Sequence, residues 1–133
     1  MKKLIIDKTY NSPKVILDPD NKKFEISGES RPEDVSEFYV PILKWFDDFG
    51  TGLKEKKISG SPSQMEFKFN IEYFNSISAT FILDIIKKIE KLRSSGSDIM
   101  IKWYYEEDDE DMLEAGKQMS RLVNFPFEYS KAE

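Results

Sequence analysis

The most regular hydrophobic pattern in the chain is an alternation of apolar and polar residues over positions 64–73. A period of two predicts a β-strand with one buried face and one polar face. The apolar positions of this segment are Met65, Phe67, Phe69, Ile71 and Tyr73. A similar alternation over 99–105 predicts a second strand, and helical spacing over 77–92 and 112–123 predicts two helices. A short apolar segment at 125–129 predicts a last strand.

The first half of the chain predicts a β-hairpin and then a helix. Apolar runs at 13–17 and 24–28 flank the turn-forming residues 18–21. A helix start follows at 31–34, where Pro and two acids suit a first turn. Pro41 falls inside the helical pattern and predicts a kink or the true start, while Gly50-Thr51-Gly52 predicts the end.

These elements predict an α/β (α+β) fold built on a mixed sheet. The strand–helix–strand order of the second half implies a right-handed crossover between parallel strands, as part of a βαβα unit. The polar face of the strand at 64–73 places the helices mainly on one side of the sheet. With 133 residues the chain fits one domain, 1–133, and the loop at 59–63 is too short for a domain linker.

Composition narrows the chemistry that the chain can perform. There is no Cys and no His, so a thiolate nucleophile or metal site, a disulfide and the commonest general base are excluded. The net charge of −5, without a basic stripe, argues against nucleic-acid and membrane partners. The first residues lack a signal-peptide pattern and no segment approaches a transmembrane span, so we expect a cytoplasmic protein.

The junction between the strand at 64–73 and the next helix is the most informative place in the sequence. Asn75 and Ser76 are ordinary helix caps. A helix start also tolerates a phosphate, because its free N–H groups and dipole favour negative charge. From the residues alone, capping is the simpler interpretation, and a phosphorylation switch at Ser76 is the alternative.

The acidic run at 106–111 is a second place where chemistry could occur. Asp108, Asp109 and Asp111 could bind a divalent cation in a small carboxylate-dependent metal enzyme, although the spacing is not that of a calcium-binding EF-hand loop. The run could also form an acidic docking surface for a basic partner. The residues favour a solvated loop whose acids stabilise the start of the following helix.

In addition, the chain resembles a known family, the SiaC-type biofilm-regulation phosphoproteins, over nearly its whole length. The matching pieces, in order, are Gly28-Glu29-Ser30-Arg31-Pro32-Glu33-Asp34, Phe38-Tyr39, Pro41, Trp45-Phe46, Tyr73-Phe74-Asn75-Ser76-Ile77-Ser78, Asp84, Trp103-Tyr104-Tyr105, Asp109-Glu110-Asp111-Met112 and Phe125-Pro126-Phe127. The order and spacing of these pieces together carry the resemblance.

The resemblance implies a fold like the STAS domain of anti-sigma-factor antagonists and a role as a binding protein, not an enzyme. In such proteins a Thr or Ser directly after the Asn is phosphorylated by an anti-sigma-type Ser/Thr protein kinase. A PPM-type phosphatase removes the phosphate. The unphosphorylated form binds and activates a diguanylate cyclase, which raises cyclic di-GMP. No cofactor or metal is implied, and STAS-like domains are often monomers.

Carried over residue by residue, the resemblance makes Ser76 the phosphoacceptor and Asn75 its preceding partner. The family pattern expects a hydroxyl at the next position, where this chain has Ile77, so Ser78 and Thr80 are the fallback acceptors. An anti-sigma-factor antagonist with the same fold is the alternative function. With the resemblance added, the switch at Ser76 is favoured over a simple cap, and Ser76 can serve as both.

Overall fold

In the part of the chain that the structure describes, six strands, in their order along the chain, form one mixed sheet that is accompanied by three helices. The computed structural model describes residues 2–55 and 64–132, so the predicted loop at 59–63 lies outside the described residues. The strands are β1 (Leu4–Ile6), β2 (Lys14–Asp18), β3 (Lys23–Ser30), β4 (Met65–Phe74), β5 (Ile99–Tyr105) and β6 (Glu128–Lys131). The helices are α1 (Val35–Lys54), α2 (Ser76–Ser94) and α3 (Glu110–Val123).

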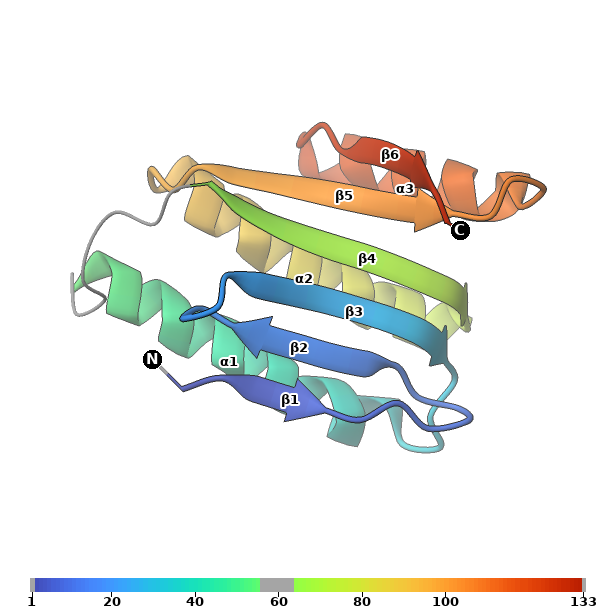
Figure 1. The fold of residues 1–133 in the computed structure, drawn as a ribbon, viewed down its shortest axis with the longest axis horizontal. Coiled ribbons are helices and arrows are strands. Elements are labelled where there is room, and N and C mark those ends of the chain that lie inside the picture. The colour runs from blue at the N-terminus through green and yellow to red at the C-terminus, as the bar shows by residue number, and fades with distance from the viewer. Residues whose placement is uncertain (1, 56–63, 133) are drawn as a thin grey trace.

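The topology explains why the helices share one face of the sheet. Strands β1, β2 and β3 pair antiparallel, and β3 through β6 pair parallel with one helix in each connection. Right-handed crossovers that all advance in the same direction place their helices on the same side. Figure 1 shows the three helices behind the sheet. The predicted fold class is confirmed, with β1 extending the predicted β2–β3 hairpin.

The core lies between the sheet and the helices and is rich in aromatic side chains. Trp103 of β5 is buried, stacks on Phe69 and Phe127, and donates its indole N–H to the Met112 carbonyl at 3.0 Å. A Cβ at Gly116 would lie 2.6 Å from the Trp103 ring, so only glycine lets α3 approach β5 this closely. The carboxyl-terminal helix is therefore fixed by close packing on one indole.

Helix α1 begins directly after the predicted start at 31–34 and ends later than predicted. Asp34 caps its start by accepting the Glu37 N–H at 3.0 Å, so Pro41 lies inside the helix and does not mark its beginning. The predicted end at Gly50-Thr51-Gly52 is wrong, because the helix continues to Lys54. Gly50 instead allows close helix packing, since a Cβ there would lie 3.2 Å from the Leu92 side chain of α2.

Candidate functional site

The predicted alternation in β4 is confirmed up to Ile71 and is wrong at Tyr73. Met65, Phe67, Phe69 and Ile71 are buried, whereas the Tyr73 side chain is 50% exposed. The pairing with β3 shifts register between Gly28 and Glu29, so that Gly28 faces Ile71 but Glu29 faces Tyr73. The extra residue of this bulge reverses the alternation. Tyr73 therefore points outward, and Phe74 packs against the core.

Asn75 caps α2, directly after this bulge. Its backbone is extended, and its side-chain oxygen accepts the Ser78 N–H at 2.8 Å. Its own N–H donates to the Ser30 carbonyl at 3.1 Å, which ties the helix start to the end of β3. Ser76 is the first residue of the helix, so the cap predicted for Asn75 or Ser76 belongs to Asn75.

The three candidate hydroxyls lie in very different environments. Ser76 is exposed on the first turn of α2. Ser78 is fully buried, and its Oγ accepts a hydrogen bond from Ser30 Oγ at 2.9 Å. Thr80 is exposed, but its hydroxyl donates to the Ile77 carbonyl at 2.6 Å. A modifying enzyme thus has direct access to Ser76, whereas Ser78 would first have to leave the core.

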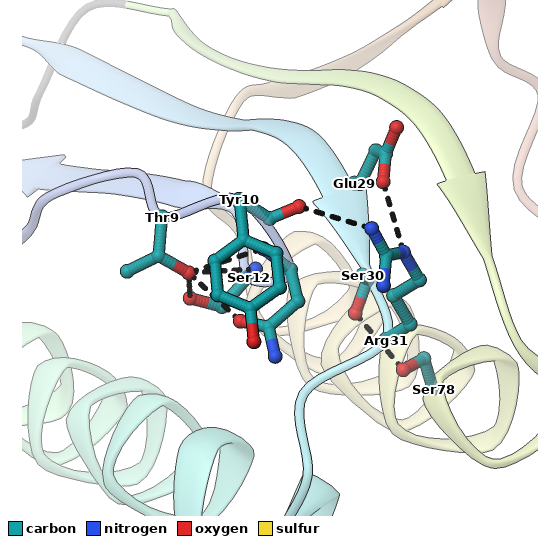
Figure 2. A network of polar contacts seen from close by, with 8 residues as sticks. Thr9, Tyr10, Ser12, Glu29, Ser30, Arg31 and Ser78 are labelled. Atoms are coloured by element: carbon teal, nitrogen blue, oxygen red, sulfur yellow. Dashed lines mark hydrogen bonds and ion pairs between the residues drawn. The ribbon is translucent and has the colours of Figure 1, made fainter.

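A buried hydroxyl network holds the first turn of α2. Ser30, at the end of β3, bonds the Tyr39 hydroxyl of α1 at 2.5 Å and donates to Ser78 of α2. Burial raises the pKa of Tyr39 to about 12. The Tyr39 ring stacks on Phe81 with 5.5 Å between centroids. Figure 2 shows Ser30 and Ser78 meeting beneath Arg31. The helix start is therefore anchored to two other elements.

The hydrogen bonds of Ser30 and Tyr39 in this network were not predicted from the sequence, although both residues fall within the pieces that carry the family resemblance. The available signal was the position of Ser30, two residues after Gly28 on the face of β3 that buries Phe24 and Ile26. A polar side chain on a buried face needs a hydrogen-bonding partner. The alternation in β3 thus marks Ser30 as a residue with a partner, but it does not identify that partner.

The sequence of this chain matches a known protein family over nearly its whole length. Residues 6–132 match the model of the SiaC family, described as regulatory phosphoproteins. The chain belongs to the SiaC family. An uncharacterized protein of Pseudomonas aeruginosa (strain UCBPP-PA14) is 22% identical over 127 residues, which cover 96% of this chain and 94% of that protein.

Solved structures of SiaC share the fold of this family member. The crystal structure of apo-SiaC from Pseudomonas aeruginosa matches with a TM-score of 0.80 and 22% identity, covering 98% of this chain and 99% of that one. The crystal structure of the diguanylate cyclase SiaD in complex with its activator SiaC, from the same organism, matches with a TM-score of 0.82 and 22% identity, covering 97% and 99%.

The acidic run of this SiaC-family chain serves the start of α3. Asp109 accepts the Met112 N–H at 3.0 Å as the helix cap, and Glu110 and Asp111 follow in the first turn. Glu107 pairs with Lys131 at 3.4 Å. In the part of the chain that the structure describes, no group of three or more acidic side chains is placed to hold a metal ion. The geometry supports the interpretation in which acids of this run stabilise the start of the following helix.

A groove of about 520 Å³ lies between the C-terminal halves of α1 and α2, at the opposite end of α2 from Ser76. Its walls include Phe46, Gly50, Leu53, Lys91 and Leu92. It contains none of the predicted site residues, so it adds nothing to the chemistry at Ser76. Among residues 2–55 and 64–132, no helix has both the length and the apolar composition to cross a membrane.

Proposed function

We propose that this chain, 1–133, is one regulatory domain that is switched by phosphorylation of Ser76 and acts by binding, not by catalysis. Its unphosphorylated form binds and activates a diguanylate cyclase, and its phosphorylated form does not. An anti-sigma-type Ser/Thr protein kinase adds the phosphate, and a PPM-type phosphatase removes it. The proposal rests on membership of a family of regulatory phosphoproteins and on a relative, SiaC, that forms a complex with the cyclase it activates.

The observation that carries the assignment to Ser76 is the contrast among the three candidate hydroxyls. Ser76 is exposed and lies directly after the capping Asn75, as the family resemblance requires. Ser78 is buried in the hydroxyl network, and Thr80 donates to a backbone carbonyl. A kinase must place the acceptor oxygen in line with the γ-phosphate of ATP, which favours an exposed hydroxyl over a buried one.

The chemistry of the switch is a phosphoryl transfer in each direction. The Ser76 Oγ forms a bond to the γ-phosphorus of ATP, the bond from that phosphorus to ADP breaks, and a base of the kinase takes the hydroxyl proton. The phosphatase uses water to release inorganic phosphate and restores the hydroxyl. Each cycle adds and removes about two negative charges at one exposed position.

The surface beside Ser76 suits a protein partner. Tyr73 and Ile77 are 50% and 60% exposed, and Tyr10, whose ring lies against Arg31, is 75% exposed. Aromatic side chains are enriched at protein interfaces because they bury a large area with little loss of conformational freedom. A phosphate on Ser76, which neighbours Ile77 in the first turn of α2, must be desolvated when a partner binds over this surface, and this cost opposes the complex.

Calorimetric titration of the diguanylate cyclase encoded in the same genome would test the proposal. The Ser76→Ala variant should bind and activate the cyclase like the unmodified protein. The Ser76→Glu variant should bind it about tenfold to a hundredfold more weakly, since one carboxylate carries less charge than a phosphate. Production of cyclic di-GMP should fall in parallel with binding.

Ser94→Glu provides the matched control. It adds the same charge to an exposed serine on the same helix, at the end away from the site. This variant should bind the cyclase as the wild type does. Equal affinity of the Ser76→Ala and Ser76→Glu variants for the cyclase would contradict the proposed switch.

A further inference from the structure

The chain segments that contain Arg31 and Ser76 lie next to each other, directly after the ends of β3 and β4. Strands β3 and β4 are parallel neighbours that end together, with Ser30 paired to Phe74. One residue further on, the Asn75 N–H still donates to the Ser30 carbonyl at 3.1 Å. The next residue on one strand is Arg31, and the residue after Asn75 is Ser76. A long cationic side chain thus begins next to the proposed phosphoacceptor.

The present contacts of the Arg31 guanidinium are exposed and exchangeable. Its Nε lies 3.0 Å from the Glu29 carboxylate, and the two side chains are 47% and 38% exposed. Its Nη2 donates to the Tyr10 carbonyl at 3.4 Å, and the guanidinium lies 5.8 Å from the centre of the Tyr10 ring. Figure 2 shows the guanidinium between Glu29 and Tyr10. Solvent screens such a pair, so little stability is lost when it breaks.

The charge around this end of the sheet makes Arg31 distinctive. In the segments 29–38 and 72–80, which form the ends of β3 and β4 and the first turns of α1 and α2, Arg31 is the sole basic residue. The acidic residues of the same segments are Glu29, Glu33, Asp34, Glu37 and Glu72. A phosphate on Ser76 would therefore enter a neighbourhood in which these segments supply five acids and one counter-charge, while Lys8 of the loop before β2 lies against Gly28.

We propose, on the basis of the proposed phosphorylation of Ser76, that Arg31 binds the phosphate by exchanging Glu29 for it. A phosphate carries more charge than a carboxylate, and its oxygens match the planar fork of a guanidinium. The exchange replaces a screened pair by a stronger one next to the modified residue. Glu29 then loses its cation, which adds to the negative charge of the modified surface.

The exchange also reaches Tyr10. The loop that carries Tyr10 is held by hydrogen bonds between the Thr9 hydroxyl and Asn11 and Ser12. The backbone N–H of Arg31 also donates to the Asn11 carbonyl at 2.9 Å. These contacts do not involve the guanidinium, so they persist when it turns toward the phosphate. Within this loop, only the Tyr10 ring and the Tyr10 carbonyl lose their contacts with the guanidinium. The modified surface then differs from the unmodified one at Tyr10 as well as at Ser76.

Phosphorus NMR on protein with phosphoserine installed at position 76 during translation tests this inference directly. The second pKa of a phosphoserine is ordinarily about 6, and a bound guanidinium lowers it because it favours the dianion. In the Arg31→Gln variant this pKa should rise by about 0.5 to 1 relative to the Arg31 protein. Arg31→Lys, which keeps the charge without the fork, should lie between the two.

Arg121→Gln is the matched control, because Arg121 is an exposed arginine paired with Glu114 on α3. It should leave the phosphoserine pKa unchanged. The same pKa in the Arg31 protein and in Arg31→Gln would overturn the inference. Because the phosphoserine is installed without a kinase, this result is independent of whether a kinase modifies Ser76, which a separate phosphorylation assay decides.

Discussion

The starts of α2 and α3 are built alike but carry different charge. Each follows a parallel strand at the same edge of the sheet, and each has a cap whose side chain accepts the N–H of the third helical residue. That third residue is also held from the core, Ser78 by Ser30 and Met112 by Trp103. The difference lies in the two residues between, Ser76-Ile77 in α2 and Glu110-Asp111 in α3.

The start of α3 therefore carries a permanent negative charge, whereas the start of α2 carries a hydroxyl that can gain and lose one. Two fixed carboxylates stabilise the start of α3, because the helix dipole favours negative charge there. The first turn of α2 has no acid and presents the neutral Ser76 hydroxyl at a helix start that Asn75 and Ser30 hold in place. A phosphate on Ser76 would give α2 the charge that α3 always has. Experiments that act on one helix start at a time test this difference between α2 and α3.

The largest effect is expected at high pH. Tyr39, which holds the start of α2 through Ser30, can ionise, whereas Trp103, which holds the start of α3, cannot. Burial raises the pKa of Tyr39 from its ordinary value of 10.0 to about 12. The contribution of neutral Tyr39 to the free energy of unfolding is fully present below about pH 10. It is lost as the pH rises toward about 12, because the tyrosine of the unfolded chain releases its proton at a lower pH than the buried one. The free energy of unfolding should fall by an amount that approaches about 2 to 3 kcal/mol.

Urea unfolding of the wild type and of Tyr39→Phe, at several pH values from about 9 to 11.5, measures this loss. The free energy of unfolding should fall more steeply with pH in the wild type, and the difference between the two proteins isolates Tyr39 from the other tyrosines. Parallel pH profiles would show that ionisation of Tyr39 does not determine the stability of the α2 anchor.

Removal of the two caps should have an intermediate effect. Asn75→Ala and Asp109→Ala each leave the N–H of the third helical residue without its acceptor, which costs about 1 kcal/mol of unfolding free energy. Asp109→Ala should cost somewhat more at low salt, because it also removes a charge that the dipole favours. Chemical denaturation with and without added salt measures both costs.

Asn75→Ser and Asp109→Asn are the controls for the caps, since each keeps a capping oxygen. Both should retain most of the wild-type stability. A cost for Asn75→Ala that stayed below a few tenths of a kcal/mol would mean that the observed hydrogen bond to Ser78 does not hold the helix start.

The smallest effect is expected when α2 is given an acid in its first turn. Ile77→Glu should raise the free energy of unfolding by about 0.3 to 1 kcal/mol at low salt, because it imitates the first turn of α3. The gain should shrink as salt is added, since the residue is exposed. Thr80→Glu, which lies beyond the first turn, should gain less, and an equal gain would argue against a dipole effect.

Much of this fold follows from patterns that act locally in the sequence. The alternation in β4 and β5 and the helical spacing in α2 predict the strands, the helix and its buried face. A cap at Asn75 or Ser76 is predicted from the place of these residues between strand and helix, and the structure assigns it to Asn75. The glycines at the end of α1 mislead, because Gly50 serves contact with Leu92, a residue of another helix.

The details of the candidate site depend on pairing between distant segments. The bulge that turns Tyr73 outward is set by the register of β4 against β3, which the alternation of β4 alone does not reveal. The network of Ser30, Tyr39 and Ser78 joins three elements, and Ser30 and Ser78 are 48 positions apart in the sequence. Ser76 could be singled out from the sequence only through the resemblance, because a serine after asparagine at a helix start is ordinary.

Phosphosite mapping by tandem mass spectrometry shows directly whether Ser76 is the residue that is phosphorylated. The protein and its Ser76→Ala variant would be incubated with ATP and the anti-sigma-type kinase encoded nearest to the gene. We expect near-complete phosphorylation of Ser76 and no phosphate on the variant. Phosphate on Ser78 or Thr80 with Ser76 unmodified, or no phosphate on the wild type, would contradict the account.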